Sequence, residues 1–211
     1  MEPIYRRDLA GMGMTRRLVA AVWRAGVLAL LLVHPAPAAE LFHLDQRYGS
    51  IGFTVSNLGL FRAQGGFARF LGALTIDPAD PTATRIAVTI RAGSVRTPWG
   101  QETAMLRSAD FFDVARYPAI RFHSQAVTAD GPGRYAIQGA LTLRGKTRPV
   151  ILRARLVRAA RDAAGRRVDD FVVTGAVSRS AFGMTADPWF IADTVHLAIH
   201  ARVILSAAPG G

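Results

Sequence analysis

The sequence predicts an all-β fold of about eight strands. Apolar residues recur at every second position through most of the chain beyond residue 40, which is the period of a strand with one buried face. Clusters of Gly, Pro and Asp separate these runs and predict short turns between antiparallel neighbours. Half of the 211 residues are hydrophobic, which is enough for a sizeable core, and no cysteine is present for a disulfide or a thiolate metal site.

The first 39 residues are predicted to be an N-terminal extension and a secretory signal peptide. Residues 14–17 form a basic start, residues 18–33 are mostly apolar, and Ala36-Pro37-Ala38 places small residues at the two cleavage positions. The apolar stretch is short for a membrane span, and Arg24 shortens it further. We expect cleavage near Ala38 or Ala39 and a periplasmic or secreted protein; an uncleaved anchor is the alternative.

The remainder, residues 40–211, is predicted to be one domain, because no linker, repeat or low-complexity tract interrupts it. The apolar faces of its strands follow in chain order: Ile51, Phe53 and Val55; Ile86, Val88 and Ile90; Ile120 and Phe122; Tyr135, Ile137, Leu141 and Leu143; Val150, Leu152, Ala154 and Leu156; Phe171, Val173 and Val177; and Val195, Leu197, Ile199, Ala201, Val203 and Leu205. Residues 64–76 are also strand-like, with glycines that predict a bulge or bend. Only residues 101–108 look helical, with a further turn near residues 111–114.

Strands with one apolar face bury it either in a sandwich or inside a barrel. A barrel of eight strands is filled by its own side chains or holds one ligand. Glycines at 65, 66, 72, 139 and 175 either leave room for such a ligand or only relieve curvature.

The formal charge is +11, and arginine supplies nearly all of it. Residues 40–211 keep 21 basic and 13 acidic residues, a net charge of +8. The basic residues are scattered and do not alternate with aromatics, so we expect no nucleic-acid partner. The charge favours solubility or weak attraction to anionic headgroups; codon usage rich in arginine is the alternative origin.

Patterns for catalysis and metal binding are not found. His196 and His200 share a strand face but lie about 13 Å apart, too far to ligate one metal. No Gly-x-Ser-x-Gly elbow is present, and Asp110 and Asp113 flank a short turn where Asp is expected as a cap. We therefore predict no catalytic residue, metal site or cofactor.

Several segments of the chain carry a more specific pattern. They are Phe42-His43-Leu44-Asp45, residues 50–55 (SIGFTV), residues 58–60 (LGL), residues 65–72 (GGFARFLG), residues 106–124 (LRSADFFDVARYPAIRFHS), residues 141–152 (LTLRGKTRPVIL) and residues 178–184 (SRSAFGM). In these segments the chain resembles the YceI family of bacterial exported proteins. The resemblance implies an eight-stranded antiparallel, lipocalin-like barrel with one or two short helices, whose cavity takes a long polyisoprenoid chain.

The chain also departs from the family pattern. Tyr48, Asn57 and Met105 stand where the family often has histidine, and Ala181 replaces a frequent aspartate. Headgroup recognition or proton chemistry that depends on those positions is not expected here, whereas binding of an apolar chain needs none of them.

We expect an exported protein that holds an isoprenoid lipid, of the polyprenyl phosphate or isoprenoid quinone type, and that contacts membrane surfaces transiently. Strand parity predicts that the lumen is lined by Phe53, Val55, Phe67, Ile120, Phe122, Ile137, Leu141, Leu152, Val173, Leu197 and Ile199. Phe111, Phe112 and Phe182 are expected to frame one end of the cavity, and Arg107, Arg121 or Arg179 to meet an anionic headgroup. The alternatives are an enzyme acting on a lipid or small ester in the same pocket, and a membrane-embedded barrel with a polar lumen.

Overall fold

The structure, a computed structural model, describes residues 40–77 and 80–205. The predicted signal peptide and its cleavage site lie outside the described residues.

The described chain consists mainly of β-strands, as predicted. The strands are β1 (Glu40–Asp45), β2 (Gly49–Asn57), β3 (Phe61–Phe67), β4 (Phe70–Ile76), β5 (Arg85–Arg91), β6 (Val95–Arg96), β7 (Ala119–Ala129), β8 (Arg134–Leu143), β9 (Lys146–Arg161), β10 (Arg167–Ser178) and β11 (Ile191–Leu205). The helices are α1 (Gly100–Arg107) and three single 3-10 turns, η1 (Pro81–Ala83), η2 (Ala92–Ser94) and η3 (Ser180–Phe182).

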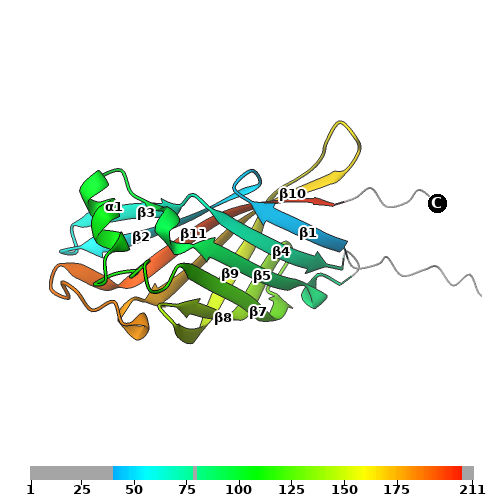
Figure 1. The fold of residues 1–211 in the computed structure, drawn as a ribbon. Helices are drawn as coiled ribbons and strands as arrows, with labels where there is room; N and C mark the ends of the chain where they lie inside the picture. Colours follow the sequence, from blue (N-terminus) through cyan, green and yellow to red (C-terminus); the bar gives the residue numbers. More distant parts are fainter. Residues whose placement is uncertain (1–39, 78–79, 206–211) are drawn as a thin grey trace, which may run out of the picture. The chain divides into compact units, whose positions relative to one another are not determined.

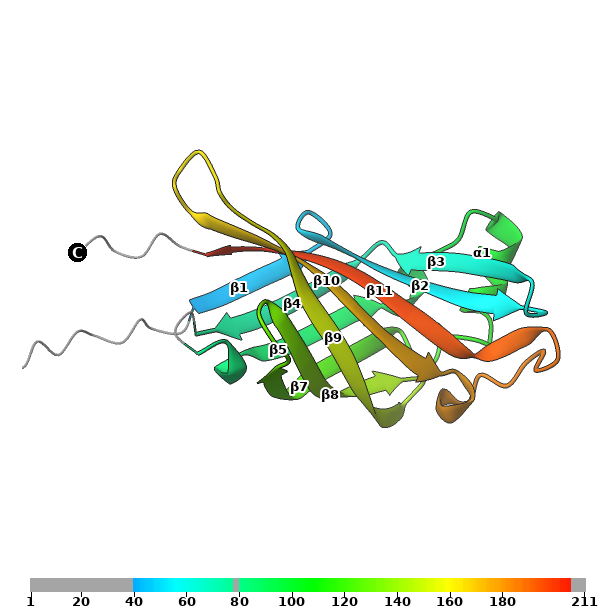
Figure 2. The same cartoon turned by 180° about the vertical axis from the view of Figure 1, so that it is seen from behind.

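All eleven strands of the described chain belong to one antiparallel sheet, in the order β1-β4-β5-β7-β8-β9-β10-β11-β2-β3-β6 (Figures 1 and 2). The prediction of eight strands was wrong in number, because β1 and β6 were not among the predicted strands and the strand predicted at residues 64–76 is divided into β3 and β4. A turn separates β1 from β2, Ala68 and Arg69 separate β3 from β4, and η2 separates β5 from β6. The bend predicted within residues 64–76 is therefore confirmed.

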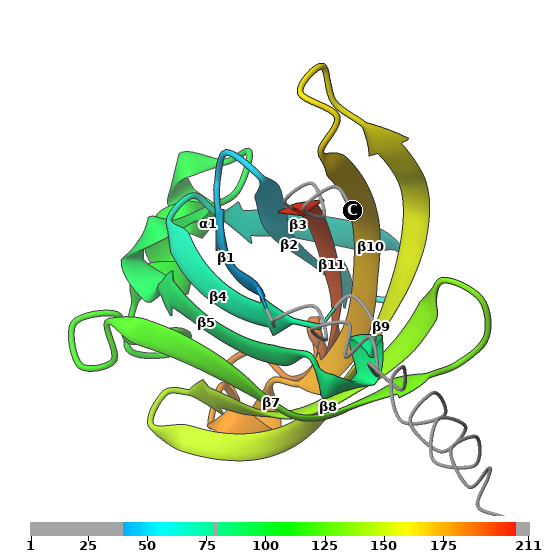
Figure 3. The same cartoon turned by 90° about the vertical axis from the view of Figure 1, so that its right-hand side faces the viewer.

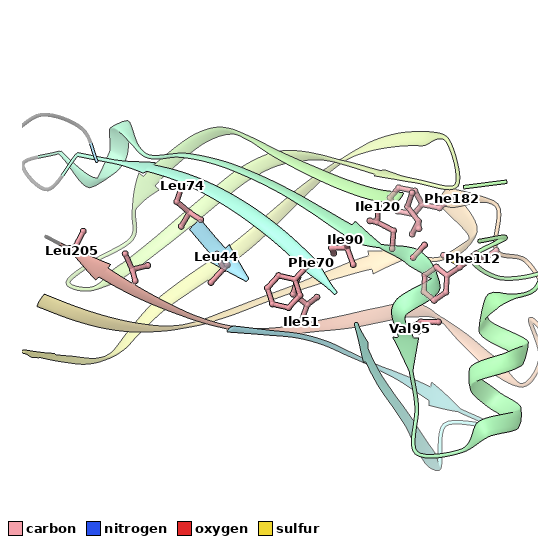
Figure 4. Close-up of a cluster of buried hydrophobic side chains, with 14 residues drawn as sticks. Leu44, Ile51, Phe70, Leu74, Ile90, Val95, Phe112, Ile120, Phe182 and Leu205 are labelled. Carbon is pink, nitrogen blue, oxygen red and sulfur yellow. The ribbon is translucent and has the colours of Figure 1, made fainter. Parts of the chain in front are cut away.

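The sheet curls around an apolar interior. β11 pairs with β2, so the last strand of the sequence lies beside one of the first. Along this pair Phe53 faces Leu197 and Val55 faces Val195, so residues of the same parity share the inner face. Figure 3 looks along the curled sheet, and Figure 4 shows buried side chains such as Leu74, Ile90 and Phe112 directed into it.

The helix predicted at residues 101–108 is confirmed as α1, one residue earlier. Its first turn is tied to the strand before it, because the Thr97 amide donates to Thr103 Oγ1 at 3.0 Å and the Thr97 hydroxyl donates to the Trp99 carbonyl at 2.7 Å. α1 therefore lies over one end of the sheet, next to β2 and β3 (Figure 1).

Two interior glycines admit aromatic rings against the strand backbone. A Cβ built on Gly139 would lie 2.5 Å from the Phe122 ring and 2.6 Å from the His123 carbonyl oxygen. A Cβ on Gly65 would lie 2.5 Å from the Phe53 ring. The space at these glycines is occupied by neighbouring rings, so at these two positions the glycine serves close packing within the sheet.

Replacement of Gly139 by alanine is expected to lower the free energy of unfolding by about 1–3 kcal/mol, because the methyl group displaces a ring or a backbone carbonyl. Urea unfolding measures the change. The control is Gly100→Ala, where nothing lies within 4 Å of the added Cβ and a helix begins. That variant is expected to keep or slightly raise stability, and an equal loss in both variants would contradict the packing argument.

Candidate ligand cavity

The curled sheet encloses a cavity of about 260 Å³. Its wall is formed by the inward side chains of the strands together with α1 and the turns that follow it. Besides the residues discussed below, the lining comprises Leu44, Ile51, Ala63, Gln64, Leu74, Ile86, Val88, Ile90, Thr97, Leu106, Leu143, Val150, Val177, Met184, Ile191, Val195 and Ala201. The wall is therefore almost wholly apolar.

All eleven residues predicted to line the lumen lie in this wall: Phe53, Val55, Phe67, Ile120, Phe122, Ile137, Leu141, Leu152, Val173, Leu197 and Ile199. Strand register explains the result, since the pairs Phe53–Leu197 and Ile137–Leu152 stand side by side on the inner face. Their contact with a ligand stays a prediction. The lumen is apolar, the reverse of what the membrane-embedded alternative predicts.

Two of the three phenylalanines predicted at the cavity end lie in the wall. Phe111 and Phe112 are buried and line the cavity. The Phe112 ring packs against Phe67 and Phe53, with centroid distances of 5.5 and 6.3 Å and steep interplanar angles. Phe182 is not part of the lining; it is 2% exposed and packs in the core behind the wall.

The turn that carries Phe111 and Phe112 is held by a distant loop. Arg144, between β8 and β9, has a left-handed backbone (φ 51°), and its guanidinium donates to the carbonyls of Ala109 and Phe111. Tyr117 packs beside the next residue of the same loop, Gly145. The two longest segments in which the sequence resembles the YceI family, residues 106–124 and 141–152, thus meet at the cavity end.

Arg179 lines the cavity, but its predicted role as a headgroup ligand is not supported by its contacts. Its side chain is 5% exposed, and all five N–H groups are directed at backbone carbonyls. The acceptors are the carbonyl oxygens of Ala192 (3.1 Å), Met184 (2.9 Å), Ala186 (2.7 Å), Ile191 (2.8 Å) and Asp187 (3.5 Å). Arg179 therefore holds the chain between η3 and β11 in place and has no donor left for a ligand.

The other two predicted headgroup residues do not line the cavity. Arg121 stands between Ile120 and Phe122 on β7 and, because those two face inward, points to the exposed outer side. Arg107, the last residue of α1, is exposed and donates to the Val95 carbonyl at 3.1 Å. A cation that is free to bind a headgroup is therefore absent from the described cavity wall.

Polar groups gather instead where α1 meets the end of β2. Asn57 continues the inward parity of Phe53 and Val55, and its Oδ1 atom is buried with no hydrogen-bond partner. Glu102 and Met105 line the same end from α1. Sequence reasoning missed these three residues as site residues, although parity along β2 already places Asn57 inside.

The cavity wall contains no His, Ser or Asp of the described chain. The Ser178 and Ser180 side chains lie 3.1 Å apart, and hydrogen bonds from Ser178 and from Ser180 hold the pKa of Asp193 below its usual value. The Asp193 carboxylate thereby joins the start of β11 to the turn that follows β10. Asp113 has a left-handed backbone (φ 46°) in the turn after α1, and its carbonyl accepts from Tyr117.

Within residues 40–77 and 80–205, no cluster of three or more His, Asp or Glu side chains is arranged to hold a metal ion. None of the helices described there is long and apolar enough to cross a membrane.

The described chain is an all-β protein whose single sheet curls around an apolar cavity, and comparison with known proteins agrees with that fold. The profile of the YceI-like domain matches residues 42–203. A UPF0312 protein of Photorhabdus laumondii is 34% identical over 161 residues, which cover 75% of this chain and 83% of the relative. Protein YceI of Salmonella arizonae is 32% identical over 161 residues, 75% of this chain and 84% of the relative.

Solved structures share the fold. BcnA of Burkholderia cenocepacia superposes with a TM-score of 0.65 at 24% identity, over 74% of this chain and 96% of BcnA. A polyisoprenoid-binding domain from Saccharophagus degradans, implicated in plant cell wall breakdown, superposes with a TM-score of 0.53 at 13% identity, over 79% of this chain and all of that domain. The chain belongs to the family of YceI-like domains.

Exchange of Arg179 for methionine is expected to lower the free energy of unfolding by about 3 kcal/mol or more, since buried carbonyls lose their donors. Thermal or urea unfolding measures the loss. The matched control, Arg121→Met on the exposed outer face, is expected to change stability by less than about 0.5 kcal/mol. If Arg179→Met unfolded like the unmodified protein and lost only ligand affinity, Arg179 would be a ligand-binding residue after all.

Proposed function

We propose that this protein binds the hydrocarbon chain of a long isoprenoid lipid in its cavity, for carriage, storage or sequestration. The observation that carries the proposal is the continuous apolar wall built from the inner faces of the strands. Removal of a branched hydrocarbon chain from water supplies the driving force, at about 25 cal/mol per Å² of apolar area. The polyisoprenoid-binding domain of Saccharophagus degradans, with the same fold, supports this choice of ligand.

The shape of the cavity suits a chain better than a compact ligand. Its lining extends from Leu44 and Leu74 at one end of the curled sheet to Phe112 near α1 at the other (Figure 4). A flexible chain follows such an elongated space with many weak contacts and without specific polar partners.

The headgroup is proposed to be uncharged, as in an isoprenoid quinone or a prenol. Glu102 and Arg179 are the charged residues of the described cavity wall, and Arg179 is saturated by backbone carbonyls. A phosphate at the polar end would meet the Glu102 carboxylate without a balancing cation, which is unfavourable. A hydroxyl group or a ring carbonyl meets no such repulsion.

The protein is further proposed to be non-catalytic and exported. The described cavity wall has one hydroxyl side chain, Thr97, and one carboxylate, Glu102. The Thr97 hydroxyl donates to the Trp99 carbonyl at 2.7 Å and not to a base, which does not favour the alternative of an ester-cleaving enzyme. The basic, apolar and small-residue order of residues 14–38 supports export. Cell fractionation tests the location, and retention in the cytoplasm would contradict it.

Narrowing of the cavity at Ala201 is expected to reduce binding of a prenol at least tenfold, because the Ala201→Phe ring occupies space at the inner wall of β11. Native mass spectrometry after incubation with geranylgeraniol measures occupancy. The matched control is Ala198→Phe on the same strand, since Ala198 is exposed on the outer face. Equal binding by both variants, with unchanged circular dichroism, would count against the cavity as the binding site.

The proposed headgroup preference is tested by Glu102→Gln. Unmodified protein is expected to bind geranylgeraniol more tightly than geranylgeranyl phosphate. The neutral amide is expected to strengthen phosphate binding about fivefold, the equivalent of ~1 kcal/mol between like charges near water, and to leave the alcohol unchanged. Titration calorimetry reads both affinities, and a phosphate that already binds the unmodified protein as well as the alcohol would refute the preference.

A further inference from the structure

Large apolar side chains are exposed together at the α1 end of the sheet. They come from the turn between β2 and β3, from α1 with its preceding residue, and from the loop before β11. This apolar rim consists of Leu58, Leu60, Phe61, Trp99, Met105, Trp189 and Phe190. Trp189 is 87% exposed and Leu60 82% exposed, so folding of the chain gains little from either residue.

The rim is held in place by the backbone around it. The Leu58 amide donates to the Phe190 carbonyl at 2.8 Å, which joins the β2–β3 turn to the loop before β11. In that loop the amides of Phe190 and Ile191 donate to the Asp187 carbonyl at 3.1 and 2.9 Å. Arg179 binds further carbonyls of the same loop, so the exposed rings are presented by a well-bonded structure.

The rim borders the polar end of the cavity. Asn57, in the cavity wall, immediately precedes Leu58, and Ile191, also in the wall, immediately follows Phe190. Met105 belongs to both the rim and the wall. At this end the exposed apolar side chains therefore lie directly beside residues of the cavity wall, and Met105 joins the two.

We propose that the apolar rim docks the protein on the surface of a lipid bilayer, so that a lipid chain passes between the bilayer and the cavity. The inference extends the proposed function by naming the partner surface. Contiguous exposed apolar residues mark interaction sites, and tryptophan prefers the bilayer interface.

The charges around the rim favour a bilayer that contains anionic lipid. Arg62 follows Phe61, Arg96 precedes Trp99 by three residues, and both side chains are exposed with no carboxylate partner in the described chain. Arg107 at the end of α1 adds to this charge, whereas Asp187, in the loop with Trp189, and Glu102, on α1, offset part of it. Apolar insertion therefore dominates, and anionic lipid adds a smaller attraction.

The test is sedimentation of the purified protein with vesicles of phosphatidylcholine, with and without phosphatidylglycerol, with the same N-terminus in every variant. The double variant Trp189→Ser/Phe190→Ser is expected to lose vesicle binding at least tenfold. The matched control is Leu71→Ser/Ile151→Ser, which removes two exposed apolar side chains away from the rim and is expected to bind vesicles normally. Brominated lipids are expected to quench tryptophan fluorescence in the control but much less in the rim variant.

Three results would overturn the proposal: vesicle binding by the rim variant equal to that of the unmodified protein, an equal loss in the control, or a rim-dependent dimer without vesicle binding. Binding of geranylgeraniol in solution separates the proposed docking of the rim on a bilayer from the proposed binding of a lipid in the cavity. Protein that binds the alcohol but docks independently of the rim refutes only the docking surface. Protein that docks through the rim but never takes up the alcohol refutes only the proposed function.

Discussion

The two-residue period of apolar side chains on a curled sheet is the constraint on which the other features depend. Because successive side chains of a strand point to opposite faces, curling the sheet turns every second residue inward. A shift of one residue in any pair would move a whole apolar set to the outside. The opposed pairs Phe53–Leu197 and Ile137–Leu152 fix that register, and the same residues then form the wall of the cavity.

Burial of Arg179 determines both the position of the loop before β11 and the kind of headgroup that the cavity can accept. Arg179 is stabilised by carbonyl dipoles around its guanidinium, and the loop that supplies them carries Trp189 and Phe190. Because all its N–H groups donate to backbone carbonyls, Arg179 holds the cavity end in place but has no donor left to bind a headgroup. One side chain thus fixes the position of the exposed rings and leaves Glu102 without a cationic counterpart in the described wall.

Periodicity predicted the strands, the inward residues and the helix, because these depend on neighbours along the chain. The same periodicity also indicates that Arg121 points outward and cannot bind a headgroup in the cavity, since Ile120 and Phe122 on either side were assigned to the lumen. The short strands β1 and β6 and the hydrogen-bond partners of Arg179 were not predictable in this way. They depend on residues brought together only by folding, as Arg144 and Phe111 are, more than thirty positions apart.

An apolar cavity inside a curled sheet raises the question of how a lipid chain reaches it. A lipid chain leaving a bilayer through water would expose the hydrocarbon whose burial drives binding. An apolar surface directly beside the cavity avoids that exposure, and the wall residues Asn57 and Ile191 are joined directly to the rim residues Leu58 and Phe190. The polar groups at the same end then suit a headgroup that remains near the opening, while the chain follows the apolar wall toward Leu74. The rim, the polar end with Glu102 and the elongated lumen thus lie in sequence along one route for a lipid chain from the bilayer into the cavity.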